Sequence, residues 1–260
     1  MIEPALPPFL TARGVSKRFG ALTALSGVDL DIRRGEVLAL LGDNGAGKST
    51  FVKILAGAHA MSGGEIRIEN QPVAFASPSD AAACGIATIF QELALSENLS
   101  VAENVFLGRE LVTRMVGLPF LRRRAMRARV EELLNELDAD IPDSGAAVGS
   151  LSGGQRQAVA ICRALNLDAR LVIMDEPTAA LAVAETRKVL SLARKLAERG
   201  CAVVLISHNL VDVFEVSDRM VVFRRGRKIA ERRREATDTD EIVSLITGAH
   251  PDARALEAVA

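Results

Sequence analysis

Apolar residues follow two alternating patterns along this chain. Three short runs of consecutive apolar residues, at 36–42, 170–176 and 201–208, each end in glycine or polar residues. Runs of this length are typical of strands that are buried on both faces of a parallel sheet. Segments with helical spacing separate them, so the pattern predicts an α/β fold.

Two helices are predicted where apolar residues recur every three or four positions. Residues 47–57 have this spacing and end near Gly57, and residues 184–200 have it and end at Gly200. The apolar positions of the second helix are Val189, Leu192, Ala193 and Leu196. Because this helix lies between the last two apolar runs, we predict a βαβ crossover there.

The other segments have weaker patterns. Residues 9–32 are interpreted as short strands broken by glycines, and residues 220–231 as a hairpin that turns near Gly226. The strand signal fades between 91 and 166, where residues 127–140 predict an amphipathic helix. We therefore predict a P-loop type α/β fold with a mixed central sheet, N-terminal antiparallel strands and an inserted helical subdomain. The expected division of a single domain, 1–260, is a core of about 1–90 and 166–248, a helical subdomain of about 91–165 and a short tail, 249–260.

Composition and charge exclude several classes of protein. Of the 260 residues 49% are hydrophobic, and 32 Lys and Arg nearly balance 33 Asp and Glu, so the chain can bury a core and has no bulk attraction for nucleic acid. Cys84, Cys162 and Cys201 stand singly and are expected to be buried thiols in a reducing compartment. Neither a signal peptide nor a membrane-spanning run is present, so we expect a cytoplasmic chain. Two basic clusters, 121–129 and 223–234, are interpreted as solvated faces because acidic residues flank them.

The strongest chemical signal lies at residues 42–50, GDNGAGKST, which match G-x-x-x-x-G-K-[ST] between a predicted strand and a predicted helix. Backbone N–H groups of such a loop surround phosphate oxygens, and the start of the helix adds favourable partial charge. Lys48 is predicted to reach the β and γ phosphates of ATP, and Ser49 to bind Mg²⁺. The predicted nucleotide-binding residues are Gly42, Asp43, Asn44, Gly45, Ala46, Gly47, Lys48, Ser49 and Thr50.

Acidic and imidazole side chains follow the other two buried strands. Asp175 ends one strand and is predicted to bind Mg²⁺, while Glu176 comes next and is predicted to face the attacking water. His208 follows the neighbouring strand and can hydrogen-bond the γ-phosphate and the water. The carboxyl ends of parallel strands meet at one edge of a sheet, so we expect Lys48, Glu176 and His208 to form a catalytic group.

A second stretch suited to phosphate lies far downstream, at residues 151–157, LSGGQRQ. Ser152 is predicted to cap a helix, and Gly153 and Gly154 leave the backbone of its first turn bare. The upstream loop already surrounds the nucleotide within one chain. We therefore expect this second stretch to serve the nucleotide of a second copy of the chain.

These motifs together resemble the ATP-binding cassette (ABC) family, whose signature is the stretch 151–157, and the resemblance covers nearly the whole chain. It implies a homodimer with two ATP molecules, each between the phosphate loop of one copy and the signature of the other. The signature residues are Ser152, Gly153, Gly154 and Gln155. The resemblance also implies that Phe19 stacks on adenine, and that Gln91 contacts Mg²⁺ and the catalytic water in a loop that meets a membrane partner. The chain departs from the family at Ala182, where aspartate is commoner, so communication between the two sites through that side chain is not expected.

Longer phrases narrow the resemblance. GDNGAGKST, FQELALSENLSVAENVFLGRE, EPTAAL and ISHNL are similar to the ATPases of bacterial importers of ribose, xylose and fructose. This similarity implies a Mg²⁺-dependent ATPase that drives integral-membrane permease subunits and acts indirectly with a periplasmic sugar-binding protein. It also implies a location at the cytoplasmic face of the inner membrane and no nucleic acid partner.

Other cassette ATPases remain as alternatives. An exporter motor has the same chemistry, so the sequence leaves the direction of transport open. A soluble DNA-repair type would carry long coiled-coil heptads before the signature, and a translation-factor type would carry two cassettes, and neither pattern is seen. A regulator without turnover would be expected to lack Glu176 or His208. Only a short segment follows Gly248 in this sequence, so regulation through an appended domain is not expected.

Overall fold

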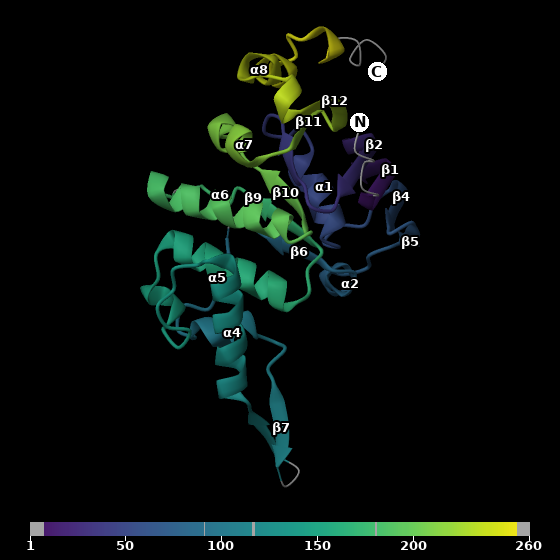
Figure 1. Cartoon of the computed structure of the whole chain (residues 1–260). Helices are drawn as coiled ribbons and strands as arrows, with labels where there is room; N and C mark the ends of the chain where they lie inside the picture. The colour runs from purple at the N-terminus through teal and green to yellow at the C-terminus, as the bar shows by residue number, and fades with distance from the viewer. Residues whose placement is uncertain (1–7, 91, 116–117, 180, 254–260) are drawn as a thin grey trace, which may run out of the picture.

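The computed structural model describes residues 8–90, 92–115, 118–179 and 181–253. Figure 1 shows a central sheet that lies between the N-terminal strands on one side and two long helices, α5 and α6, on the other. These helices span Gly153–Asn166 and Val183–Glu198. The inserted segment extends away from this body and ends in a small hairpin (Figure 1).

The central sheet has the strand order β12-β11-β3-β10-β9-β6. All neighbouring pairs are parallel except β11 and β12, which makes the sheet mixed, as predicted. Every residue of β3 and β10 is buried, which explains the continuous apolar runs in the sequence. The strands are β3 (Val37–Leu41), β6 (Ile86–Ile89), β9 (Leu171–Asp175), β10 (Ala202–Ile206), β11 (Arg219–Arg224) and β12 (Arg227–Arg233).

The predicted helices on this sheet are present. Helix α1 (Lys48–Leu55) follows β3 directly, and α6 connects β9 to β10 in the predicted crossover. All four predicted apolar positions of α6 are buried. Its end at Gly200, with a φ of 86°, uses the left-handed conformation that glycine adopts readily. The shorter helices of the core are α2 (Pro78–Ala83), α7 (Leu210–Val216), α8 (Thr239–Thr247) and the 3₁₀ turn η2 (Arg234–Ala236).

The N-terminal strands form a separate antiparallel sheet of order β2-β1-β4-β5. Its members are β1 (Pro8–Phe19), β2 (Leu22–Arg33), β4 (Gly63–Ile68) and β5 (Gln71–Val73). The prediction of short strands broken by glycines was wrong here, because β1 and β2 each run for 12 residues. Gly14 and Gly27 have φ values of 61° and 63° and lie where the register of the pair shifts, so they form bulges and do not end the strands.

The inserted segment is mainly helical, as predicted. It contains α3 (Val101–Val105), α4 (Arg123–Leu137), the 3₁₀ turn η1 (Val148–Ser150) and α5. A hairpin of β7 (Val112–Met115) and β8 (Leu118–Leu121) was not predicted. All four residues of β8 are exposed, so the hairpin has no alternation of buried and exposed apolar residues that could reveal it.

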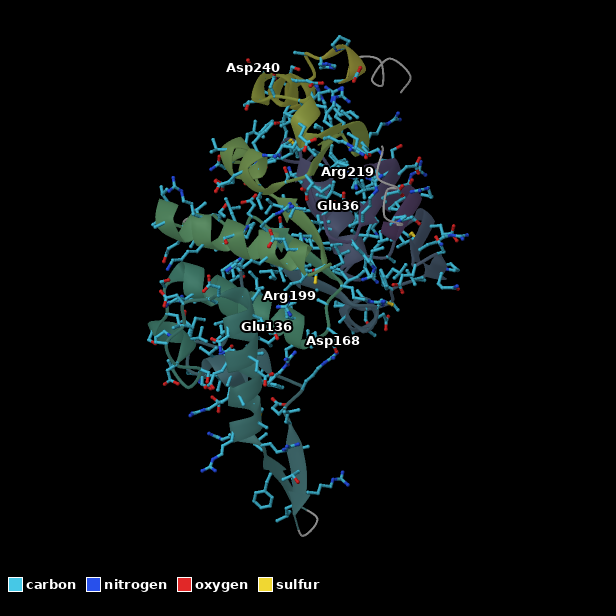
Figure 2. The ribbon with its side chains drawn as sticks, viewed as in Figure 1. Glu36, Glu136, Asp168, Arg199, Arg219 and Asp240 are labelled. Carbon is cyan, nitrogen blue, oxygen red and sulfur yellow. The ribbon has the colours of Figure 1, made fainter. Side chains whose placement is uncertain are left out.

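One buried and one exposed ion pair join the parts of the molecule. Arg219 of β11 is 4% exposed and bonds to Glu36, which directly precedes β3, and to Glu231 of β12, so it links three neighbouring strands at one end of the central sheet. Figure 2 labels Arg219 and Glu36. Arg199 of α6 pairs with Glu136 of α4 and so ties the insert to the core (Figure 2). Cys162 and Cys201 are buried as expected, and burial raises the pKa of Cys162 to about 12, but Cys84 is only half-buried.

Within the described ranges, no helix is long and apolar enough to cross a membrane.

Candidate nucleotide site

The phosphate loop lies between β3 and α1, at the carboxyl edge of the central sheet. A side chain at Gly42 would place its Cβ 2.2 Å from the carbonyl oxygen of Phe223, so the neighbouring strand β11 permits only glycine there. Gly47 caps α1 with a φ of 106°. The loop therefore keeps a backbone shape in which successive N–H groups can face an anion.

The turn between β11 and β12 holds this loop in place. The Gly226 N–H donates to the carbonyl of Ala46 at 2.9 Å, and the Ser26 N–H of β2 donates to the carbonyl of Gly226 at 2.8 Å. Arg225 and Gly226 line the nucleotide cavity, although they lie about 180 positions downstream of the loop in the sequence. Sequence reasoning placed the turn near Gly226 but gave it no role, because only the β3–β11 pairing brings it to the site.

Lys48 is 6% exposed and lies inside the loop. Its Nζ donates to the carbonyl oxygens of Gly42 at 2.6 Å and Asp43 at 3.1 Å. Burial lowers the pKa of Lys48, and the nearby carboxylates of Glu176, Asp43 and Asp175 oppose that shift. The ammonium is therefore held among oxygen acceptors at the position where phosphate-loop lysines act.

Asp175 and Glu176 take up the two different environments that the sequence predicted. Asp175 ends β9, and burial, followed by the charge of Glu176, raises its pKa, while Lys48 acts in the opposite direction. Glu176 has a φ of 50°, a left-handed conformation that costs about 1–3 kcal/mol for a residue with a side chain. Its backbone N–H donates to the carbonyl of Ile206 on β10 at 2.9 Å, which fixes the turn.

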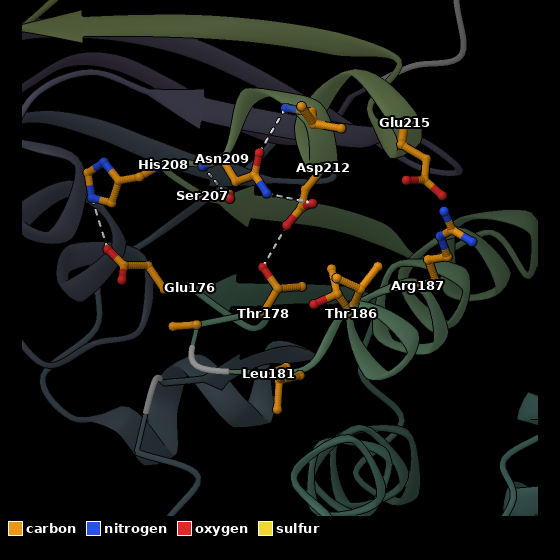
Figure 3. A pocket seen from close by; sticks show the side chains of 13 residues that line it. Glu176, Thr178, Leu181, Thr186, Arg187, Ser207, His208, Asn209, Asp212 and Glu215 are labelled. Atoms are coloured by element: carbon orange, nitrogen blue, oxygen red, sulfur yellow. Dashed lines mark hydrogen bonds and ion pairs between the residues drawn. The ribbon is translucent and has the colours of Figure 1, made fainter.

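His208 lies at the end of the neighbouring strand, as predicted. Its Nε2 is 2.9 Å from Oε1 of Glu176 (Figure 3). At this distance an imidazole N–H can donate to the carboxylate and orient it. Three of the predicted catalytic residues line one cavity of about 500 Å³: Lys48, Glu176 and His208.

The same cavity contains most of the predicted nucleotide-binding residues. Phe19 lies at its edge, 43% exposed, with its ring 5.4 Å from that of His59 and 4.9 Å below the ammonium of Lys17. An exposed aromatic ring at this place can stack on a base. Gln91 lies outside the described residues. The lining residues are Phe19, Leu22, Thr23, Ala24, Asp43, Asn44, Gly45, Ala46, Gly47, Lys48, Ser49, Thr50, Glu176, Ile206, His208, Arg225 and Gly226.

The signature residues form a helix start but lie outside this cavity. Ser152 caps α5 by accepting from the Gln155 N–H at 3.3 Å, and the Gln155 side chain accepts from the Ser152 N–H at 3.0 Å. This reciprocal pair is the predicted cap. Cβ atoms added at Gly153 and Gly154 would lie 2.5 Å from Cδ2 of Leu181 and 3.2 Å from Cβ of Glu185, so a larger residue at either position would require these neighbouring side chains to move.

A second cavity of about 510 Å³, drawn in Figure 3, shares Glu176 and His208 with the first. It is bounded by the loop after β9 and by the start of α7. Asp212 lines this cavity and accepts hydrogen bonds from the Thr178 hydroxyl and from the Asn209 amide, both at 2.9 Å. None of these three residues was predicted to belong to the site, because the bond between loops 34 positions apart leaves no local pattern in the sequence.

The fold and this site define an ATP-binding cassette. The family model described as ABC transporter matches residues 25–179, and the chain belongs to that family. Solved structures agree with this assignment. A nucleotide-free ATP-binding cassette from an ABC transporter aligns with a TM-score of 0.77 at 25% identity, over 96% of this chain and 98% of that one. A dimeric cassette in a post-hydrolysis state, bound to ADP and Pi, aligns with a TM-score of 0.71 at 27% identity, over 88% and 100%. The predicted cassette fold is confirmed, and the protein is an ABC ATPase.

Curated relatives are more similar in sequence. The chain is 47% identical to the xylose/arabinose import ATP-binding protein XylG of Sulfolobus acidocaldarius, over 92% of this chain and 93% of that protein. It is 46% identical to the fructose import ATP-binding protein FrcA of Rhizobium meliloti, over 98% and 99%. It is 42% identical to the ribose import ATP-binding protein RbsA of Yersinia pestis, of which it spans 46%. The predicted similarity to the ATPases of this importer group is confirmed.

Proposed function

We propose that this chain is the ATP-hydrolysing subunit of a membrane importer for a monosaccharide. The observation that carries the proposal is one cavity lined by Phe19, the phosphate loop, Glu176 and His208, in a chain that matches a fructose import ATP-binding protein at 46% identity over 98% of its length. Binding of ATP closes a dimer of two copies, and hydrolysis reopens it. A permease in the membrane converts this cycle into transport.

The residues on the cavity have separate tasks in this proposal. The backbone of the phosphate loop and the ammonium of Lys48 bind the β and γ phosphates and stabilise the charge that develops between them. Glu176 accepts a proton from the attacking water, and His208 orients the Glu176 carboxylate through the 2.9 Å contact. Phe19 stacks on the adenine ring.

Mg²⁺ fits the oxygen groups beside the phosphate loop. Ser49 offers a hydroxyl and Asp175 a carboxylate, and Gln91 is the third proposed ligand, so all three are hard oxygen donors. Mg²⁺ in nucleotide sites takes few protein ligands because phosphate oxygens and water supply the rest. This matches the finding that the described residues contain no cluster of three or more acidic, histidine or cysteine side chains for a metal. The bound ion would neutralise phosphate charge during hydrolysis.

The separation of the signature from the nucleotide cavity supports the homodimer. Gly153 and Gly154 present backbone N–H groups at the start of a 14-residue helix, outside the cavity of their own chain, whereas the Ser152 N–H donates to the Gln155 side chain. Such a helix start attracts an anion. In a dimer of two copies it would meet the γ-phosphate that the other copy binds.

A groove near the expected membrane loop supports a permease partner. The loop that contains Gln91 follows Phe90, which is 39% exposed and lines a groove of about 230 Å³ between α2 and the end of α5. We propose that cytoplasmic loops of the permease dock there. This would hold the ATPase at the cytoplasmic face of the inner membrane, where a periplasmic sugar-binding protein acts on it indirectly through the permease.

The test is ATP hydrolysis by the chain assembled with a candidate sugar permease and its sugar-binding protein. We expect one monosaccharide, supplied with the binding protein, to raise the hydrolysis rate several-fold over the rate without sugar. The matched control is the same assembly with Glu176→Gln, which should not respond. Stimulation by a substrate without any binding protein would favour an exporter, and a chain that hydrolyses ATP without any permease partner would favour a soluble cassette ATPase.

A further inference from the structure

Two loops that carry proposed catalytic residues are joined by a buried carboxylate at the base of the second cavity (Figure 3). Asp212 is 6% exposed. Its Oδ2 accepts from the hydroxyl of Thr178, two residues after Glu176, and its Oδ1 accepts from the amide of Asn209, next to His208. Each oxygen of the carboxylate therefore bonds to a different loop.

The connection is reinforced on both sides. Asn209 caps α7 by accepting from the Val211 N–H at 3.0 Å, and its own N–H donates to the hydroxyl of Ser207 at 3.1 Å. The Thr178 carbonyl accepts from the Leu181 N–H at 3.3 Å, so the loop after β9 is fixed as well. Movement of either loop relative to the other would leave the buried carboxylate without one of its donors, which is costly.

We infer that Asp212 is a positioning residue that holds the Glu176 carboxylate against the His208 imidazole. This inference rests on the proposed roles of Glu176 and His208. The inference also concerns Ala182, where the chain departs from the commoner aspartate of the family. Ala182 follows Thr178 in the same loop and has no polar side chain. The carboxylate of Asp212 ties this loop to the segment that contains His208.

The test compares Asp212→Ala with Asp212→Asn. Alanine removes both acceptors, and we expect kcat for ATP hydrolysis to fall by about tenfold to a hundredfold with KM for ATP unchanged, since proton transfer depends on the orientation of the base. Asparagine keeps both links, because its oxygen accepts from Asn209 and its amide donates to the Thr178 hydroxyl, which accepts as well as donates. It should restore kcat to within a few-fold of the unsubstituted chain.

Thr178→Val is the milder variant, because it removes one link and keeps the buried volume. We expect it to lower kcat in part, and the double variant with Asp212→Ala should be no slower than Asp212→Ala alone. Glu215→Ala is the matched control, since Glu215 lines the same cavity from the same helix but is exposed, and it should leave kcat unchanged. Asparagine as slow as alanine, or a rise in KM without loss of kcat, would overturn the positioning role. Normal turnover in Glu176→Gln would instead overturn the proposed function on which it rests.

The hairpin of the inserted segment carries an independent inference. Its exposed apolar side chains are Val112, 54% exposed, Leu118, 62%, Phe120, 50%, and Leu121, 45%. An isolated two-stranded hairpin is only marginally stable. These exposed apolar side chains therefore add little to the stability of the fold, and such a patch often marks a binding surface. Figure 1 shows the hairpin at the end of the molecule farthest from α8.

Arginine surrounds this apolar surface. Residues 109–129 include seven arginines and a single acidic residue, Glu110. Arg123 and Arg129 pair with Glu103 and Glu132, whereas Arg114, Arg122 and Arg124 form no ion pair within the part of the chain that the structure describes. The structure thus exposes apolar and cationic groups together at one tip, which the interpretation of cluster 121–129 as a solvated face did not include.

We propose that this hairpin binds the anionic surface of the membrane. The positive charge of the tip favours lipid over the permease as the binding partner. The cytoplasmic loops of membrane proteins carry an excess of Lys and Arg and would repel the tip. Anionic headgroups attract each exposed arginine, and the apolar side chains can enter the interface between headgroups and acyl chains.

The test is cosedimentation of the purified chain with vesicles of phosphatidylcholine, with or without phosphatidylglycerol. We expect binding only to the anionic vesicles, weakened by added salt. Arg122→Gln with Arg124→Gln should weaken it about thirtyfold, and Leu118→Ser with Phe120→Ser should weaken it as well. Arg227→Gln with Arg233→Gln removes the same charge from β12 and is the control that should bind normally. Equal loss in that control, equal binding to neutral vesicles, or hairpin variants that bind vesicles but lose the permease would each overturn the proposal.

Discussion

Glu176→Gln should remove nearly all steady-state ATP hydrolysis and leave ATP binding intact. The amide keeps the size of the side chain and can still accept from His208, but it cannot take a proton from water. A loss of about 100-fold to 10,000-fold in kcat is expected for a missing general base. The cavity wall around the phosphates, which the loop and Lys48 form, does not change. The measurements are turnover by phosphate release and the Kd for ATP by titration, together with sedimentation to detect a trapped closed dimer.

The matched comparison is Lys48→Ala. This change removes an ammonium that lies within hydrogen-bond distance of the loop carbonyls, at the place where phosphate oxygens bind. It should weaken ATP binding itself and so differ from Glu176→Gln, which should not. Near-normal turnover in Glu176→Gln would remove that residue from the role of base, and equal ATP affinity in the two variants would contradict the division of tasks between them.

Local patterns predicted the parts of the site that follow buried strands. Asp175, Glu176 and His208 each come directly after a run of apolar residues, and parallel pairing of β9 and β10 places Asp175 opposite Ile206 in the register. The phosphate loop is defined by spacing within nine residues, and the structure places it between β3 and α1. These features depend on residues that are close together in the sequence, so the apolar periodicity and the phosphate-loop motif were sufficient to predict them.

Other parts of the site depend on contacts between distant segments. Gly226 reaches the phosphate loop only because β11 pairs with β3, and Asp212 reaches Thr178 only because α7 follows β10 back across the sheet edge. Glu176 adopts a positive φ that no local pattern indicates. The hairpin of β7 and β8 was missed for a different reason, since its exposed residues are not sorted by burial and so have no period.

A mixed dimer should retain one trapped ATP when Lys48→Ala is placed in one copy and Ser152→Asp in the other. If each site joins the phosphate loop of one copy to the signature of its partner, both defects fall in one site and the second stays intact. Ser152→Asp is chosen because aspartate caps a helix as well as serine does, so α5 is kept, while its charge repels the γ-phosphate. The control is a homodimer with Ser152→Asn, because asparagine caps equally without the charge and this dimer should retain ATP at both sites.

The experiment adds Glu176→Gln to both copies, so that bound ATP is not hydrolysed, and counts the nucleotide retained by each purified dimer. Each parent homodimer should retain almost none, because every one of its sites contains a defect. A mixed dimer that forms but retains almost none would mean that each copy uses its own signature. The geometry argues against that result, since Ser152, Gly153, Gly154 and Gln155 do not line the cavity that holds Lys48 and Glu176 in the same chain. Only a second copy can then bring the start of α5 to the γ-phosphate, and the retained nucleotide measures whether it does.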